Sequence, residues 1–147
     1  MGRVPAVLLI VMCFFLGCRK PYVIESIASH ATLSTSWSEF RLEHILRWSE
    51  PEEELSFRID TPHRIGEHLE IIGPEGEGFV PEVELVANDG KTFLMDTHGF
   101  LGGEIFFTFK SRPSALTSVA AIRVRSSIPI IVSNMIWRGY DPKNVKR

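Results

Sequence analysis

The strongest structural signal in the chain is the stretch from Val83 to Met95, which reads VELVANDGKTFLM. Apolar and polar residues alternate in its first part, as they do in a half-buried strand, and β-prone residues return in its second part. Asn88, Asp89 and Gly90 lie between the two parts. This pattern predicts a β-hairpin, because glycine readily adopts the positive φ that a tight turn requires. We expect a type I′ turn with Gly90 at a positive φ.

Similar patterns recur on both sides of this hairpin. Apolar and polar residues alternate, or β-branched and aromatic residues gather, in four further stretches: Leu55–Asp60, Glu104–Lys110, Ala121–Ser126 and Ile130–Trp137. Several short strands at a spacing of roughly ten residues are typical of a β-sandwich or barrel. The sequence therefore predicts an all-β protein, and we expect a single β-sandwich.

One segment, residues 36–48, fits both a helix and a strand. Ser36 and Glu39 have the spacing of a helix capping box, and several apolar residues between Trp37 and Trp48 could share one helical face. However, the residues at every second position from Phe40 to Trp48 also alternate as a strand would: Phe40, Leu42, His44, Leu46 and Trp48. We favour the strand and keep a single short helix as the alternative.

The composition is that of one folded domain. The chain has 147 residues, of which 44% are hydrophobic and 23% charged, and its formal net charge is −2. These values exclude a disordered tail and a general nucleic-acid binder. Residues 39–84 hold 13 acidic and 4 basic side chains, whereas residues 85–147 hold 4 acidic and 9 basic ones. The two halves could form surfaces of opposite sign, but strands of a sandwich interleave, so we expect the charges to cancel.

The first 18 residues have the features of a secretory signal. An uncharged run of 15 residues extends from Val4 to Cys18 and follows one basic residue, Arg3. This length suits the apolar region of a signal peptide, since a membrane-spanning helix needs roughly 20 residues. An uncleaved signal anchor, favoured by Arg19 and Lys20, and a core segment of a cytosolic protein are the alternatives.

The end of this run, Leu16-Gly17-Cys18, resembles the lipobox of bacterial lipoproteins, although Phe15 and Leu16 depart from its usual residues. The resemblance implies that Cys18 is lipidated and becomes the mature N-terminus. We then expect a signal peptide over residues 1–18, a tether over 19–36 and the sandwich over 37–147. No cysteine follows Cys18, so the exported domain would need no disulfide chemistry.

The later part of the chain weakly resembles the galactose-binding-like jelly-roll sandwiches. The residues that suggest this are Val83–Phe93, as the hairpin, and Ala121–Tyr140, as a closing strand pair. The resemblance implies a jelly-roll-like sandwich that binds sugars through loops at one end. It assigns no site residue, and fold by itself does not determine function.

Tests for common catalytic and metal motifs are negative. His63 and His68 lack the spacing of zinc-peptidase motifs, and the glycines of residues 73–78 are accompanied by Glu75 and Glu77, which would repel phosphate. No serine stands in a Gly-x-Ser-x-Gly elbow. Three carboxylates remain as possible acid–base or calcium-binding groups: Asp89, Asp96 and Glu104. We expect no catalytic residue, no metal and no cofactor.

The most suggestive cluster lies near the C-terminus, where Trp137, Arg138, Tyr140 and Asp141 follow a predicted strand. Two aromatic rings, a guanidinium and a carboxylate could stack on a sugar and bind its hydroxyls, and such residues are common in interfaces. In the alternative interpretation Trp137 closes the core and Tyr140 tethers the tail.

These observations lead us to expect a non-catalytic lipoprotein of the bacterial cell envelope that faces the periplasm or the exterior. It would act as a binding or structural module for a glycan or an envelope protein, attached to the membrane by an N-terminal lipid, with no nucleic-acid partner. A glycan-directed enzyme with a loop-built carboxylate site and a subunit of an envelope complex are the alternatives.

Overall fold

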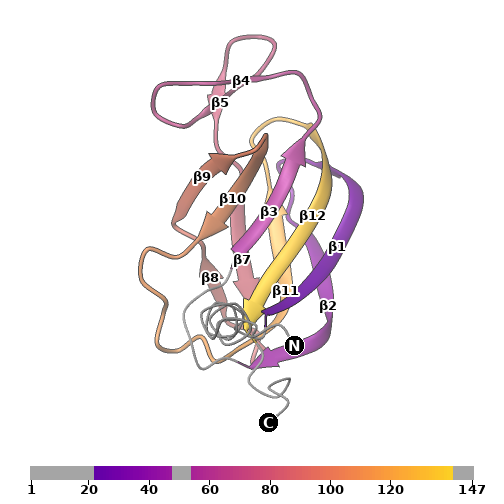
Figure 1. The fold of residues 1–147 in the computed structure, drawn as a ribbon, viewed down its shortest axis with the longest axis vertical. Helices are drawn as coiled ribbons and strands as arrows, with labels where there is room; N and C mark the ends of the chain where they lie inside the picture. The colour runs from indigo at the N-terminus through magenta and orange to yellow at the C-terminus, as the bar shows by residue number, and fades with distance from the viewer. Residues whose placement is uncertain (1–21, 48–53, 141–147) are drawn as a thin grey trace, which may run out of the picture.

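The computed structural model describes residues 22–47 and 54–140. Within these residues the chain forms twelve β-strands and no helix, which confirms the all-β prediction (Figure 1). The strands are β1 (Tyr22–Leu33), β2 (Ser38–Arg47), β3 (Glu54–Ile59), β4 (Arg64–Ile65), β5 (Ile71–Ile72), β6 (Gly78–Phe79), β7 (Glu82–Val86), β8 (Thr92–Leu94), β9 (Thr97–Leu101), β10 (Glu104–Thr108), β11 (Ser118–Arg125) and β12 (Ile130–Tyr140). No helix in the described residues is long and apolar enough to cross a membrane.

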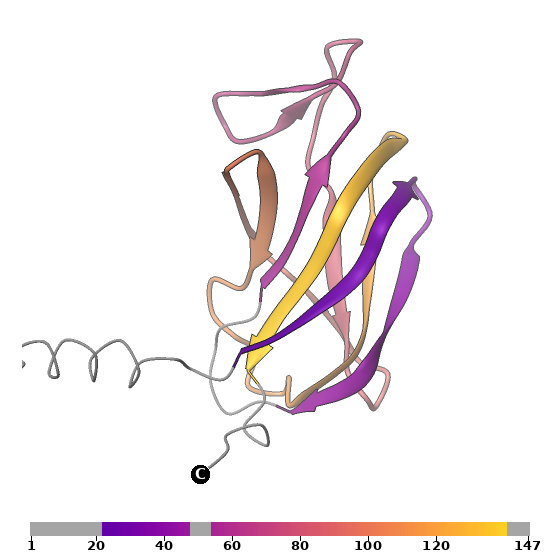
Figure 2. The ribbon, with the colours of Figure 1, turned by 45° about the vertical axis from the view of Figure 1, so that its right-hand side comes forward.

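Two antiparallel sheets form the layers of a sandwich (Figure 2). Sheet A has the order β1-β12-β3-β10-β9, and sheet B has the order β2-β11-β7-β8. The pairs are nested: β1 pairs with β12, β2 with β11, β3 with β10, and β7 with β8. A long hairpin wound around a core in this way is a jelly roll. The predicted jelly-roll-like sandwich is therefore confirmed.

The core lies between the sheets and follows from the period-two alternation of the strands. On β3, Leu55, Phe57 and Ile59 are buried and face inward, while Arg58 is exposed. Phe57 and Phe107 stack across β3 and β10 with ring centroids 5.7 Å apart. Inward-facing apolar residues of both sheets complete one continuous cluster.

Strand β1 corrects the predicted domain boundaries. Residues 22–33 were expected within a tether, but they form an antiparallel strand that pairs with β12 from Tyr22↔Tyr140 to Leu33↔Ile130. Leu33 is fully buried, so the strand contributes to the core. Its alternation is hard to see in the sequence, because a register shift between Ser26 and Ala28 interrupts it. The sandwich therefore begins before residue 37.

The segment that fits both a helix and a strand, residues 36–48, forms a strand over most of its length, which is the interpretation that we favour from the sequence. β2 runs from Ser38 to Arg47 and pairs with β11, so no helix forms within this range. The pairing places Phe40 opposite Ile122, and both contact the core. Trp48 lies outside the described residues.

The predicted hairpin is present between β7 and β8, but its turn type differs. The Gly90 N–H donates to the Ala87 carbonyl at 2.9 Å, and the Ala87 N–H donates to the Lys91 carbonyl at 2.8 Å. Gly90 has φ +84, whereas neither Asn88 nor Asp89 has a positive φ. A type I′ turn needs two positive φ values, so that prediction is wrong. The loop is instead a three-residue connection, a type I turn followed by a left-handed glycine.

The carboxylate of Asp89 supports this turn. It accepts a hydrogen bond from the Lys91 backbone N–H at 3.1 Å, and that bond, with the nearby Lys91 ammonium, lowers the pKa of Asp89 below its usual value. The Asp89 carboxylate therefore stabilises the turn.

Residues 60–81 form an insertion at one end of the sandwich, between β3 and β7 (Figure 1). It contains the small sheet β4-β5-β6. The insertion is fixed at its base by the Ile131 N–H, which donates to Thr61 Oγ1 at 2.8 Å, and at its side by His98, whose Nε2 lies 2.9 Å from the Leu69 carbonyl. We call this end, which also carries the β1–β2 and β11–β12 connections, the loop end.

Candidate functional site

The predicted C-terminal cluster does not form one site. Trp137 is 0% exposed and belongs to the core, paired in register with Leu55. Its ring therefore cannot stack on a ligand, and the predicted ligand contact is wrong for Trp137. The alternative, that Trp137 closes the core, agrees with this burial. The sequence could not distinguish the two, since an aromatic residue near a strand end suits both.

Arg138 lies on the opposite face of sheet A from Trp137, because neighbouring residues of a strand point to opposite sides. Its Nη1 donates to Glu54 Oε1 at 2.6 Å, a cross-strand ion pair on the outer face. Asp141 and the side chain of Tyr140 lie outside the described residues. Cys18, the predicted lipid-attachment residue, lies outside them as well.

The structure shows contacts for two of the candidate carboxylates, Asp89 and Asp96, and both accept backbone hydrogen bonds from nearby loops or strand ends. Asp96 Oδ1 accepts the Lys110 backbone N–H at 2.7 Å, which links the β8–β9 connection to the end of β10. His63 Nδ1 lies 2.7 Å from the Thr61 carbonyl. Within residues 22–47 and 54–140, no group of three or more His, Cys, Asp or Glu side chains could hold a metal ion.

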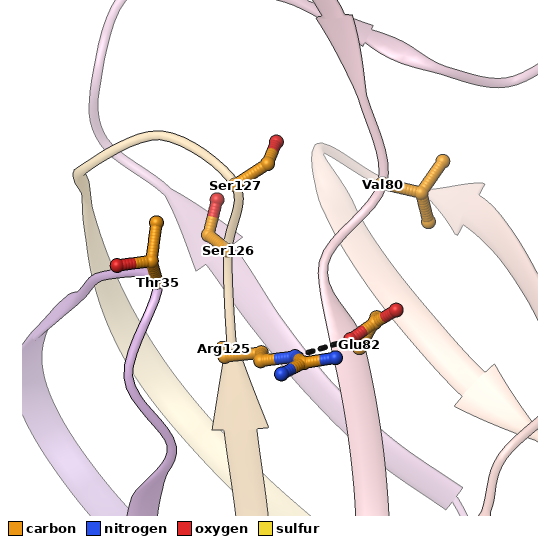
Figure 3. Close-up of a pocket in the computed structure, with 6 residues that line it drawn as sticks. All are labelled: Thr35, Val80, Glu82, Arg125, Ser126 and Ser127. Carbon is orange, nitrogen blue, oxygen red and sulfur yellow. Dashed lines mark hydrogen bonds and ion pairs between the residues drawn. The ribbon is translucent and has the colours of Figure 1, made fainter.

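A pocket of about 280 Å³ lies at the loop end of the sandwich. It is formed where the β1–β2 connection, the approach to β7 and the end of β11 meet (Figure 3). The lining residues are Thr35, Val80, Glu82, Arg125, Ser126 and Ser127. The strand register explains the convergence, because Arg125, the last residue of β11, stands opposite Glu82, the first residue of β7.

Arg125 and Glu82 form the charged wall of the pocket. The Arg125 Nε donates to Glu82 Oε2, and the guanidinium carbon lies 4.4 Å from the centroid of the Trp37 ring. The ion pair and the cation–π contact both restrain the guanidinium. The contacts of Arg125 within the described residues leave its Nη1 and Nη2 without an acceptor, so these donors remain for a ligand.

Ser126 belongs to the lining of the same pocket, but its hydroxyl oxygen is buried. The residue is 1% exposed, and its Oγ has no hydrogen-bond partner among the described residues. Its backbone N–H donates to the Ser34 carbonyl at 2.8 Å, which ties the end of β11 to the β1–β2 connection. A buried hydroxyl without a partner costs about 1–3 kcal/mol.

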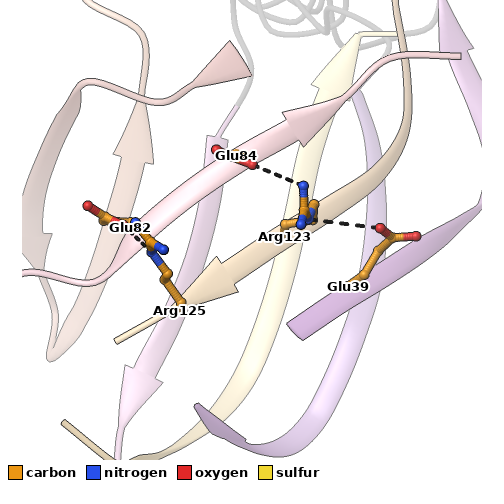
Figure 4. Close-up of polar contacts among 5 residues, drawn as sticks. All are labelled: Glu39, Glu82, Glu84, Arg123 and Arg125. Carbon is orange, nitrogen blue, oxygen red and sulfur yellow. Dashed lines mark hydrogen bonds and ion pairs between the residues drawn. The ribbon is translucent and has the colours of Figure 1, made fainter. Parts of the chain in front are cut away.

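The outer face of sheet B carries a ladder of cross-strand ion pairs beside the pocket (Figure 4). Arg123 Nη1 lies 3.4 Å from Glu84 Oε2, and Arg123 Nε lies 4.0 Å from Glu39 Oε2. These pairs join the acidic and basic halves of the sequence on one surface. The expectation that the opposite charges cancel is confirmed for this face.

A second hollow, of about 300 Å³, lies in the insertion. Its lining is Pro62, His63, Arg64, Ile72, Gly73 and Pro74. Nearby on the β4–β5 hairpin, Ile65 and Leu69 are 40% and 47% exposed. This part of the loop end is therefore more apolar than the pocket beside β11.

Sequence reasoning did not find the pocket beside β11. Its hydroxyl residues belong to no motif and come from segments far apart in the chain. The available signal was the pair of arginines at every second position of β11 and the pair of glutamates at every second position of β7. Comparison of the chain with protein-family models, curated proteins and solved structures finds no match.

Proposed function

We propose that the protein is a non-catalytic binding module of the bacterial cell envelope, attached by a lipid on Cys18, and that it binds a glycan in the pocket at the loop end. The observation that carries this proposal is the convergence of a restrained ion pair, Arg125–Glu82, with two exposed hydroxyl residues, Thr35 and Ser127, in one pocket. Small-ligand sites of this kind place a few polar groups in a concave surface formed by a rigid scaffold. The run ending at Cys18 supports the envelope location.

The pocket suits binding better than glycoside hydrolysis. Hydrolysis uses two carboxyl groups about 5–10 Å apart on either side of the scissile bond. Among the described residues that line the pocket, Glu82 provides one carboxylate, and Arg125 already binds it. Among the described residues, the lining thus offers groups that can bind hydroxyls but not the pair of carboxyl groups that glycoside hydrolysis uses.

The test compares two arginines of the same strand. The full-length lipoprotein in detergent is screened against immobilised envelope glycans, as wild type, Arg125→Ala and Arg123→Ala. Both arginines face the same side of β11, lie near the Trp37 ring and pair with a β7 glutamate, but only Arg125 lines the pocket. We expect Arg125→Ala to weaken binding about tenfold or more, and Arg123→Ala to retain it.

The proposal is wrong if wild type binds no glycan, or if the two variants lose binding equally. Circular dichroism on both variants shows whether the fold is retained, which separates loss of the site from loss of the sandwich.

A protein partner is the second candidate, and the exposed Ile65 and Leu69 on the insertion favour it. Single exposed apolar residues are common, but two on one protruding hairpin offer an apolar contact surface. In this case Leu69→Ser would reduce partner binding, whereas Arg125→Ala would leave it intact.

A further inference from the structure

Exposed apolar side chains are concentrated at the loop end. Five large apolar side chains are exposed in the described residues, and four of them lie at this end: Ile65, Leu69, Leu101 and Ile131. Leu101, at the tip of the β9–β10 hairpin, is 77% exposed. Figures 1 and 2 both show this tip beside the insertion, and the contact of 2.9 Å between His98 Nε2 and the Leu69 carbonyl joins the two. Such a concentration is typical of a contact surface.

The hollow of about 300 Å³ in the insertion gives this surface a concave part. Two prolines, Ile72 and Gly73 supply most of its lining, with His63 and Arg64 beside them. The anchor side chains of protein interfaces fill hollows of this kind.

The backbone of Leu69 is a separate observation. Its φ of +61 lies in the left-handed region, which favours glycine and asparagine. The Leu69 N–H donates to the Gly66 carbonyl at 3.2 Å, so the leucine ends a tight turn. A leucine is strained in this conformation, and nearly half of its side chain is exposed. Stability does not explain the leucine, whereas contact with a partner does.

The carboxylates of the loop end differ from those of the sheets. In the sheets, glutamates pair with arginines, as Glu54 does with Arg138. Four glutamates form no hydrogen bond or ion pair with any described residue: Glu67, Glu75, Glu77 and Glu104. Three of them belong to the insertion, and the fourth lies at the tip of the β9–β10 hairpin.

This charge limits what can dock. Residues 60–81 hold one basic side chain, Arg64, and five acidic ones: Asp60, Glu67, Glu70, Glu75 and Glu77. An apolar centre among unpaired carboxylates complements a basic protein surface with an apolar side chain. The same carboxylates repel the headgroups of an anionic bilayer.

We propose that the insertion and the tip of the β9–β10 hairpin form a docking surface for a basic protein segment. One apolar side chain of that segment enters the hollow, Ile65, Leu69 and Leu101 pack beside it, and the four unpaired glutamates contact its lysines or arginines. This inference rests on the second candidate function, a protein partner, and names the chemistry of that partner. It is independent of the pocket beside β11.

The experiment selects ligands from a library of random peptides of about 12 residues, displayed on phage, with the full-length protein in detergent. We expect the enriched peptides to carry a net positive charge and at least one large apolar residue. Their affinity should fall about tenfold or more between low salt and about 0.5 M salt. Enrichment of neutral or acidic peptides, or no enrichment, would overturn the proposal.

Leu69→Asn separates contact from structure. Asparagine tolerates the left-handed region, so the melting temperature should stay the same or rise, while affinity for a selected peptide should fall about tenfold or more. Leu94→Asn is the control, because Leu94 is 53% exposed but lies on β8, away from the insertion, and this variant should bind as wild type does. Unchanged affinity in Leu69→Asn would overturn the docking surface.

Glu67→Gln tests the charge. It should weaken peptide binding and reduce its dependence on salt, whereas Glu39→Gln, which removes a carboxylate paired with arginines on sheet B, should do neither. Equal effects of the two variants would assign the salt dependence to net charge and overturn the role of the unpaired glutamates.

The same variants distinguish other occupants. Retention on immobilised phosphatidylglycerol, or self-association in sedimentation, that is lost in Leu69→Asn would assign the surface to lipid or to a second copy and overturn the proposal. Arg125→Ala should leave peptide affinity unchanged, and a loss would place the peptide in the pocket beside β11. Peptide binding as expected without any glycan binding would refute the glycan proposal alone.

Discussion

At the scale of the residue, Gly90 shows how a backbone angle rather than a side-chain contact constrains the sequence. Its φ of +84 lies in the left-handed region, and a Cβ added there would meet no atom within 4 Å. A substitution is therefore resisted by the conformation of the residue itself. The hairpin could be predicted from the sequence because this requirement is local.

We predict that Gly90→Val lowers the free energy of unfolding by about 1–2 kcal/mol or more, since a β-branched residue is strained at positive φ. Chemical denaturation of the two proteins measures the difference. Gly90→Asn is the control, because asparagine tolerates the left-handed region, and it should cost less. Equal midpoints for wild type and the valine variant would contradict the turn geometry.

At the scale of the element, the strands that could be predicted are those with clean alternation. In β3, β7 and β11 apolar and polar residues alternate over four residues or more, so their inner faces can be read directly, whereas β10 is indicated by its aromatic and β-branched residues. β1 could not be placed, because its register shift breaks the pattern, and β4, β5 and β6 are only two residues long. The pocket could not be predicted from the sequence for a different reason. Thr35, Glu82 and Ser126 come together only through the nested pairing of the whole jelly roll.

The inner and outer faces of β12 give a prediction at this scale. Trp137→Ala should lower the free energy of unfolding by about 3–5 kcal/mol, because it empties part of the core beside Leu55. Arg138→Ala, on the outer face of the same strand, should cost no more than about 1 kcal/mol, since surface ion pairs contribute little. Thermal and urea unfolding of both variants provide the comparison. A Trp137 variant as stable as the Arg138 variant would place the indole outside the core.

At the scale of the whole molecule, attachment to the membrane is the feature that the sequence suggests most directly. Cys18 ends the apolar run, follows Gly17, and is the last cysteine of the chain. Two or more acyl chains give stable membrane attachment, whereas one chain gives only marginal binding.

We predict that Cys18→Ser blocks lipid modification and leaves an unprocessed precursor. Cells labelled with a fatty-acid analogue should show label on the wild type and none on the variant, and the variant should migrate as the longer chain. Cys13→Ser, within the same apolar run, is the matched control and should be labelled normally. Label on the Cys18 variant, or none on wild type, would mean that the protein is secreted or anchored in another way.

Strand β1 has a consequence for where such a protein could work. It starts four residues after Cys18, and its twelve residues extend roughly 35–40 Å to the loop end, where Thr35 enters the pocket. With a lipid on Cys18, the lipid-bearing end of β1 and the pocket would therefore lie at opposite ends of the same strand. A ligand could then enter the pocket from the side that faces away from the point of attachment.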